Sequence, residues 1–175
     1  MKRGGPLARR TPLRRGSSKP KATGGKKRRT LEEMTHSELE ALLDAEVSFF
    51  VRATPAIYNQ RGGMVQCVTC GRWHYWKDLD CGHYIPRHRQ GTRYDLRNVR
   101  PQCTQCNSWH EGEHWKFRQV LVAEIGEREV QAIELLASMW GSDRHSRGWL
   151  ILEIEKWRER NKPLKKAIKE LEEGR

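Results

Sequence analysis

Two pairs of cysteines, each with two residues between its members, constrain most strongly how this chain can fold. The pairs are Cys67 with Cys70 and Cys103 with Cys106. Two intervening residues let both thiolates of a pair face one ion, and two such pairs complete a tetrahedral site of four sulfurs, for which zinc is the usual occupant. Four thiolates leave no open coordination position. We therefore expect one structural zinc ion that joins two segments of the chain.

The segment between the pairs is longer than in a simple zinc ribbon. It contains 32 residues, against roughly 15 to 20 in the ribbon pattern, which indicates an inserted element. A fifth cysteine, Cys81, lies inside it; it is either an alternative ligand or, as we expect, a buried thiol. A mean hydropathy of −0.89 is low for a well-filled core, so bound metal would supply folding energy. Cysteines used for metal rather than disulfides favour a reducing, cytoplasmic location.

The positive charge is concentrated at the N-terminus. Residues 1–30 contain twelve of the 34 lysines and arginines and no acidic residue, and the remaining 145 residues carry 22 basic and 22 acidic side chains. A segment of this composition cannot bury enough surface to fold alone, so we predict a disordered basic arm over 1–30. It would bind nucleic acid through phosphate contacts; the alternative is a solubilising extension. No apolar run is long enough to cross a membrane, and the N-terminus lacks the apolar stretch of a secretory signal.

The periodicity predicts an α+β fold. Thr35 and Glu38 can form a capping box at the start of a helix, and Pro55 is expected to end that helix near Thr54. Pro163 is expected to interrupt the last helix of the chain. The predicted strands cover 64–67, 73–76 and 79–85, and the later helices begin near Thr104 and cover about 115–125, 127–140 and 146–160. The predicted division is an N-terminal helical segment over 31–60, a zinc-bound core over 61–114 and C-terminal helices over 115–175.

The insert between the cysteine pairs has residues suited to phosphodiester chemistry. Five arginines and one acid, Asp95, lie between positions 87 and 100, which predicts a phosphate-binding surface. The arginines are Arg87, Arg89, Arg93, Arg97 and Arg100. His83 is a suitable base near neutral pH; the alternative is a histidine that only caps a strand. An asparagine can fix an imidazole ring, and an Asn or Asp beside the cysteines is a suitable ligand for Mg²⁺ or Mn²⁺.

These motifs, "CVTCG", "DCGHY", Arg93 with Asn98, and "QCTQCN", resemble the HNH or ββα-metal nuclease motif. In this order they are most similar to the NinG/Rap family of recombination endonucleases of lambdoid phages. The resemblance implies a small zinc-stabilised ββα-metal core flanked by helices. It implies that His83 is the general base, that Asn98 orients its ring and that Asn107 binds a catalytic Mg²⁺ or Mn²⁺.

The sequence departs from the motif at Gly82, where many HNH nucleases have a metal-binding Asp. Residues 80 and 82 share a face of a strand because side chains alternate. Asp80 could therefore replace the missing ligand.

The resemblance implies an endonuclease that cuts branched recombination intermediates such as Holliday junctions and D-loops. A non-catalytic zinc-binding adaptor for branched DNA and a sequence-directed HNH nicking enzyme are the alternatives. The expected partner is DNA, with no membrane. A homodimer is possible; the apolar residues that would form either its interface or ordinary core are Trp140, Trp149, Leu152 and Trp157.

Overall fold

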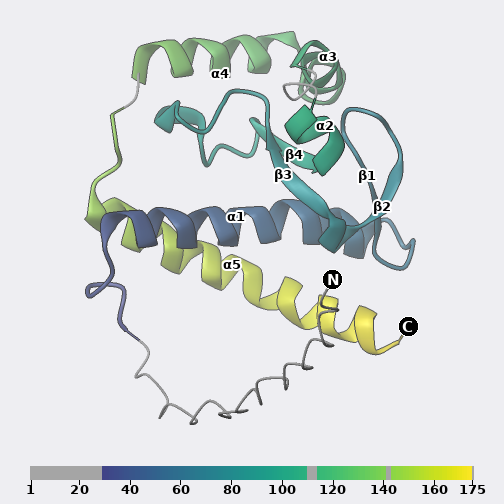
Figure 1. The fold of residues 1–175 in the computed structure, drawn as a ribbon, viewed down its shortest axis with the longest axis horizontal. Helices are drawn as coiled ribbons and strands as arrows, with labels where there is room; N and C mark the ends of the chain where they lie inside the picture. Colours follow the sequence, from purple (N-terminus) through teal and green to yellow (C-terminus); the bar gives the residue numbers. More distant parts are fainter. Residues whose placement is uncertain (1–28, 110–113, 141–142, 175) are drawn as a thin grey trace, which may run out of the picture.

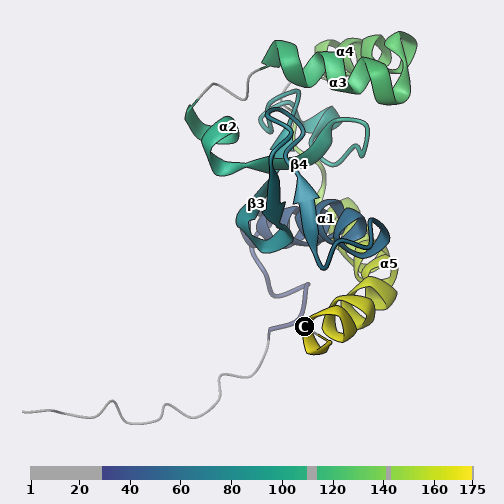
Figure 2. The same cartoon turned by 90° about the vertical axis from the view of Figure 1, so that its right-hand side faces the viewer.

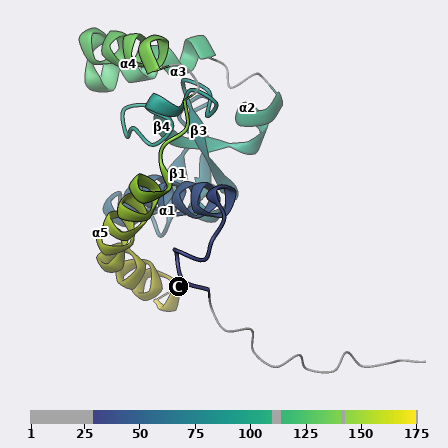
Figure 3. The same cartoon turned by 90° about the vertical axis from the view of Figure 1, so that its left-hand side faces the viewer.

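The structure, a computed structural model, describes residues 29–109, 114–140 and 143–174. The predicted basic arm therefore lies outside the described residues except for its last two positions. The described parts form a mixed α+β fold in three layers (Figure 1). Helices α1 and α5 form one layer, two small sheets lie in the middle, and helices α3 and α4 form the opposite layer, as the views from either side show (Figures 2 and 3).

Helix α1 (His36–Tyr58) begins at the predicted capping box. Thr35 Oγ1 accepts a hydrogen bond from the Glu38 amide at 3.3 Å, and the Glu38 carboxylate accepts one from the Thr35 amide at 2.7 Å. The predicted end near Thr54 is wrong, because the helix continues through Pro55. Only one turn follows this proline, and burial of Ala53 and Ala56 on either side of it offsets the missing backbone donor.

Helix α5 (Arg147–Glu173) also continues through its proline, so the predicted interruption at Pro163 is wrong. An apolar stripe extends across the proline and packs α5 along α1, and this tertiary packing outweighs the local preference of proline. The buried apolar residues of the stripe are Leu150, Ile154, Trp157, Leu164 and Ile168. Of the four residues considered for an interface, Trp157 is buried in this core, Trp149 packs against it, and Leu152 and Trp140 are exposed.

The four strands form two antiparallel pairs; the first three lie close to the predicted positions, and the fourth, β4, was not predicted. Strand β1 (Met64–Gln66) pairs with β2 (Trp73–Tyr75), and β3 (Leu79–His83) pairs with β4 (Val99–Cys103). A 3₁₀ turn, η1 (Trp76–Asp78), links β2 to β3, and a second, η2 (Gln90–Thr92), lies in the loop between β3 and β4. The short helix α2 (Thr104–Trp109) follows β4 directly. Strands β3 and β4 with α2 form a continuous ββα unit that lies against α1 (Figure 1).

Helices α3 (His114–Ile125) and α4 (Glu127–Trp140) form a hairpin, in agreement with the predicted break at Gly126. Gly126 has a φ of +87°, a backbone conformation that glycine adopts without steric cost. Phe117 and Leu121 of α3 and Ile133 of α4 pack with residues just after β3 to form a separate core. This core fixes the α3–α4 hairpin to the loop that follows β3.

Among the described helices, none combines the length and the apolar character needed to cross a lipid bilayer.

Candidate active site beside a four-cysteine cluster

The four paired cysteines converge on one point. Cys67 and Cys70 lie in the turn between β1 and β2, Cys103 ends β4, and Cys106 lies in α2. Their Sγ atoms all lie within 4.8 Å of one another, and the Cys70 and Cys103 sulfurs are 4.0 Å apart. A tetrahedral zinc site with Zn–S distances of about 2.3 Å has sulfurs about 3.8 Å apart. The cluster can therefore hold a metal ion such as zinc.

Hydrogen bonding and burial shift the pKa values of the cluster's thiols in opposite directions. Burial opposes ionisation of Cys70, but its hydrogen bonds with Arg72, Cys67 and Cys106 together outweigh burial and lower the pKa of this thiol to about 6. Burial raises the pKa of Cys103 and Cys106. These two thiols ionise readily only when a metal ion replaces their protons.

Cys81 lies outside this group of four. Its side chain packs against the core between α1 and α5, and burial raises the pKa of its thiol to about 12. Cys81 is thus a partly buried thiol outside the cluster, where the prediction was a buried one.

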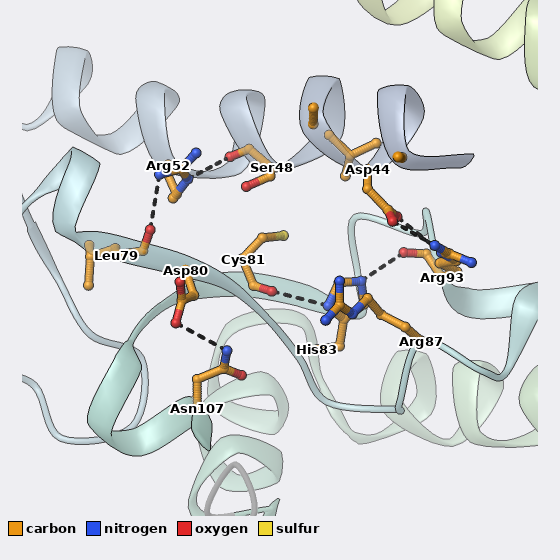
Figure 4. Close-up of a pocket in the computed structure, with 13 residues that line it drawn as sticks. Asp44, Ser48, Arg52, Leu79, Asp80, Cys81, His83, Arg87, Arg93 and Asn107 are labelled. Carbon is orange, nitrogen blue, oxygen red and sulfur yellow. Dashed lines mark hydrogen bonds and ion pairs between the residues drawn. The ribbon is translucent and has the colours of Figure 1, made fainter. Parts of the chain in front are cut away.

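A pocket of about 400 Å³ lies between α1, β3 and the start of α2 (Figure 4). His83 and Asp80 line it from β3, and Asn107 lines it from α2. The ββα unit therefore brings together three of the predicted site residues. Its other polar lining residues are Asp44, Ser48, Arg52, Arg87 and Arg93.

His83 lies at the end of β3 with both ring nitrogens beside backbone carbonyl groups. Nδ1 is 3.1 Å from the Cys81 oxygen, and Nε2 is 3.1 Å from the Arg93 oxygen. Burial lowers the pKa of His83 below its ordinary value, although the two carbonyl contacts oppose this. The ring is therefore neutral at pH 7 and has one N–H to donate.

Asp80 and Asn107 are in direct contact. Asn107 Nδ2 donates a hydrogen bond to Asp80 Oδ2 at 3.2 Å. Turning the Asn107 amide about its terminal bond would present its oxygen beside the carboxylate, and two such oxygens suit a hard divalent cation. The structure thus places both predicted metal ligands together.

Gly82 has a steric reason for departing from the nuclease motif. A Cβ atom at this position would lie 2.3 Å from Oε1 of the buried Gln102, on the neighbouring strand β4. An aspartate at position 82 would displace Gln102. Asp80 is therefore the acidic residue of β3 that reaches the pocket.

The structure does not place Asn98 against the His83 ring, contrary to the role predicted for it. Asn98 is fully buried, and its amide Nδ2 donates hydrogen bonds to the carbonyls of Ile85 and Thr92, at 3.0 and 2.9 Å. Its Oδ1 accepts a hydrogen bond from the Ile85 amide at 2.7 Å. The backbone groups of the loop between β3 and β4 need partners once buried, and Asn98 supplies three. Its side-chain hydrogen bonds order this loop.

Three of the five arginines predicted to contact DNA are held by carboxylates. Arg93 pairs with Asp44, Arg97 with Asp95 and Glu129, and Arg100 with Glu124. These pairs neutralise most of the charge that the sequence places in the insert. Arg87 and Arg89 are exposed and form no ion pair with any described residue, so they remain the candidates for phosphate contact.

Helix α1 forms one wall of the pocket, which the sequence reasoning missed. Asp44, Ser48 and Arg52 recur every four residues and so lie on one face of the helix. Arg52 donates hydrogen bonds to the carbonyls of Ser48 and Leu79, at 3.2 and 3.0 Å. The sequence signal for this polar face was the four-residue spacing of these side chains among the apolar residues of α1. Only the fold shows that this polar face meets β3.

Comparison with known proteins identifies the family. The family described as "Bacteriophage Lambda NinG protein" matches residues 7–173. Proteins named ninG from Escherichia phage 933W and Salmonella phage P22 are each 30% identical to this chain over 89 residues, and that of Escherichia phage lambda is 29% identical. Each match covers 47% of this chain and 41% of the relative, so the match spans less than half of these relatives' length. No solved structure matches the chain significantly.

Proposed function

Because this chain belongs to the bacteriophage lambda NinG family, we propose that it is a metal-dependent endonuclease with a ββα-metal, or HNH-like, core. Its substrate is DNA, and the family resemblance favours branched recombination intermediates such as Holliday junctions and D-loops. The observation that carries the proposal is the pocket shared by His83, Asp80 and Asn107. These residues belong to one ββα unit. When the cysteine cluster binds zinc, it would hold β4, α2 and the β1–β2 turn together.

His83 serves as the general base. Burial lowers the pKa of the ring, and in the tautomer with its proton on Nε2 the Arg93 carbonyl, 3.1 Å away, accepts the hydrogen bond. Nδ1 then carries the lone pair. A water molecule that displaces the contact with the Cys81 carbonyl can lose its proton to Nδ1 as it attacks phosphorus.

Asp80 and Asn107 are suited to hold the catalytic ion. Their polar atoms lie 3.2 Å apart in a pocket that also contains His83. Bound there, Mg²⁺ or Mn²⁺ would supply positive charge to the scissile phosphate and to the leaving oxygen. The remaining coordination positions would be filled by water and substrate, as is usual for Mg²⁺.

Arginines on two sides of the pocket are suited to bind the DNA backbone. Arg87 lines the pocket after β3, and Arg52 lines it from α1. Arg89, which follows Arg87 by two residues, is exposed and free of ion pairs with the described residues, so it is a further candidate for phosphate contact. The twelve basic residues of positions 1–30 would add affinity that falls with salt concentration, because each phosphate contact releases a counterion.

A non-catalytic adaptor for branched DNA is the second candidate. It is favoured by the contacts of both His83 nitrogens with carbonyl groups, which occupy the ring in the present arrangement. Cleavage then would not occur, and the exposed arginines with the basic segment would account for binding alone.

A cleavage assay separates these functions and tests the substrate class. Labelled Holliday junctions and linear duplexes of the same sequence are incubated with the protein and Mg²⁺ or Mn²⁺, with EDTA as a control. The proposal predicts cleavage of the junction only, in the presence of either metal ion. Binding without cleavage would support the adaptor, and equal cleavage of junction and duplex at one sequence would support a sequence-directed nicking enzyme.

A further inference from the structure

Arg93 links the His83 ring to helix α1. Its backbone oxygen lies 3.1 Å from His83 Nε2. Its guanidinium donates two hydrogen bonds to the Asp44 carboxylate, from Nε to Oδ1 at 3.0 Å and from Nη2 to Oδ2 at 2.6 Å. Figure 4 shows this connection from α1 through Arg93 to the ring.

On the basis of the function proposed above, we infer that Asp44 is a positioning residue: it anchors Arg93 so that the Arg93 carbonyl fixes the tautomer and orientation of the His83 base. Asp44 lies outside the ββα unit, on the face of α1 that lines the pocket. Helix α1 would therefore position the base through Arg93 as well as support the sheet.

The ring needs this anchor because it faces two carbonyl oxygens and, when neutral, has one N–H to donate. A proton on Nε2 leaves the lone pair on Nδ1, and a proton on Nδ1 reverses the arrangement. A carbonyl held firmly beside Nε2 selects the first tautomer. A mobile carbonyl would let the Cys81 oxygen compete for the proton.

Arg93 is held on two sides. Its side chain is only 14% exposed, and Glu40 adds a second carboxylate at 3.6 Å from Nη1. The preceding residue, Thr92, has its carbonyl fixed by the buried Asn98 amide at 2.9 Å. A two-point guanidinium–carboxylate pair restricts direction as well as distance. Asn98 and Asp44 thus hold the backbone and the side chain of one short segment.

Asp44→Asn tests the inference, because it keeps the size of the side chain while removing the charge. The matched control is Glu46→Gln on the same helix, whose carboxylate pairs with Lys165 and not with a pocket residue. We expect Asp44→Asn to lower kcat for junction cleavage about 10-fold or more and to leave KM within about twofold. Glu46→Gln should leave both unchanged.

A second measurement separates this inference from the proposed function. Nitrogen-15 NMR of the His83 ring, assigned with His83→Gln, reports which nitrogen is protonated whether or not the protein cleaves DNA. We expect protonation of Nε2 in the wild type and a mixture of tautomers in Asp44→Asn. The inference is overturned if the variant keeps the wild-type tautomer and kcat. If the wild type cleaves no DNA but Asp44→Asn still changes the tautomer of His83, the proposed function is refuted and the positioning role of Asp44 stands.

Arg93→Lys provides an independent test should Asp44→Asn fold poorly. A lysine keeps the charge but cannot form the two-point pair, so it should produce the same loss of kcat and the same mixture of tautomers. The double variant should be no worse than either single variant, because both changes break one connection. Additive losses in the double variant would contradict the inference.

Discussion

Asp80 and Asn107 are 27 residues apart in the sequence, yet their side chains meet at 3.2 Å. Asp80 belongs to β3, and Asn107 follows Cys106 in α2. Cys106 shares its cluster with Cys67 and Cys70 of the β1–β2 turn. Metal binding by the cysteines would therefore fix the helix that carries Asn107, and with it the distance to Asp80.

The first prediction concerns Asp80. Asp80→Ala should lower kcat for metal-dependent cleavage by about 100-fold or more, since it removes the one charged ligand from the proposed ion site. Affinity for the junction should change little. Asp78→Ala is the control, because Asp78 is an exposed carboxylate two residues earlier. Full activity of Asp80→Ala over a Mn²⁺ titration would rule out the assigned ligand.

The second prediction concerns the cysteine cluster. Cys103→Ser, or removal of metal by a strong chelator, should abolish the folded state, because structural zinc sites supply about 10–16 kcal/mol of binding energy at neutral pH. Cys81→Ser should retain one zinc ion per chain and the fold. Elemental analysis and circular dichroism measure both outcomes. Loss of zinc from Cys81→Ser would show that the set of ligands is wrong.

The third prediction concerns Gly82. Gly82→Ala should lower the free energy of unfolding by about 2 kcal/mol, because its Cβ would displace Gln102. Gly148→Ala is the control: no atom lies within 4 Å of a Cβ at that position of α5, so alanine should be neutral or stabilising. Urea denaturation measures both. Equal stability of Gly82→Ala and the wild type would contradict the steric account.

The fourth prediction concerns pH. Burial lowers the pKa of His83 below its ordinary value of 6.5, so more than half of the rings are neutral at pH 6.5 and the neutral fraction rises with pH. Cleavage should therefore not decline until the pH falls below about 6.5. The pKa of this histidine is higher in the unfolded chain than in the folded one, so as pH falls the unfolded chain takes up the proton at a higher pH. The free energy of unfolding should therefore decrease as pH falls below about 6.5. A decline in kcat already complete above pH 7 would contradict the assignment.

The sequence predicted those features that depend on local spacing. The two cysteine pairs located the cluster, and apolar periodicity located α3 and α4 almost to the residue. Pro55 and Pro163 misled the prediction because burial on both sides of each proline outweighs a local preference that acts on one turn.

The site residues were predicted only where the ββα unit alone determines their positions. His83, Asp80 and Asn107 meet within this unit. Apart from the local pair of Arg97 with Asp95, the partners of Arg93, Arg97 and Arg100 come from α1, α4 and α3, so their pairing required the tertiary fold. For the same reason the role of α1 in the pocket could not be recognised from its apolar stripe.

The most direct test of the central claim is the single-turnover rate at which saturating His83→Ala protein cleaves a Holliday junction, the proposed substrate. His88→Ala is the control, because His88 lies exposed on the loop after β3. The account predicts that His83→Ala loses about 100-fold or more of the rate while still binding the junction, and that His88→Ala retains it. A His83→Ala protein that cleaves at the wild-type rate would contradict the account.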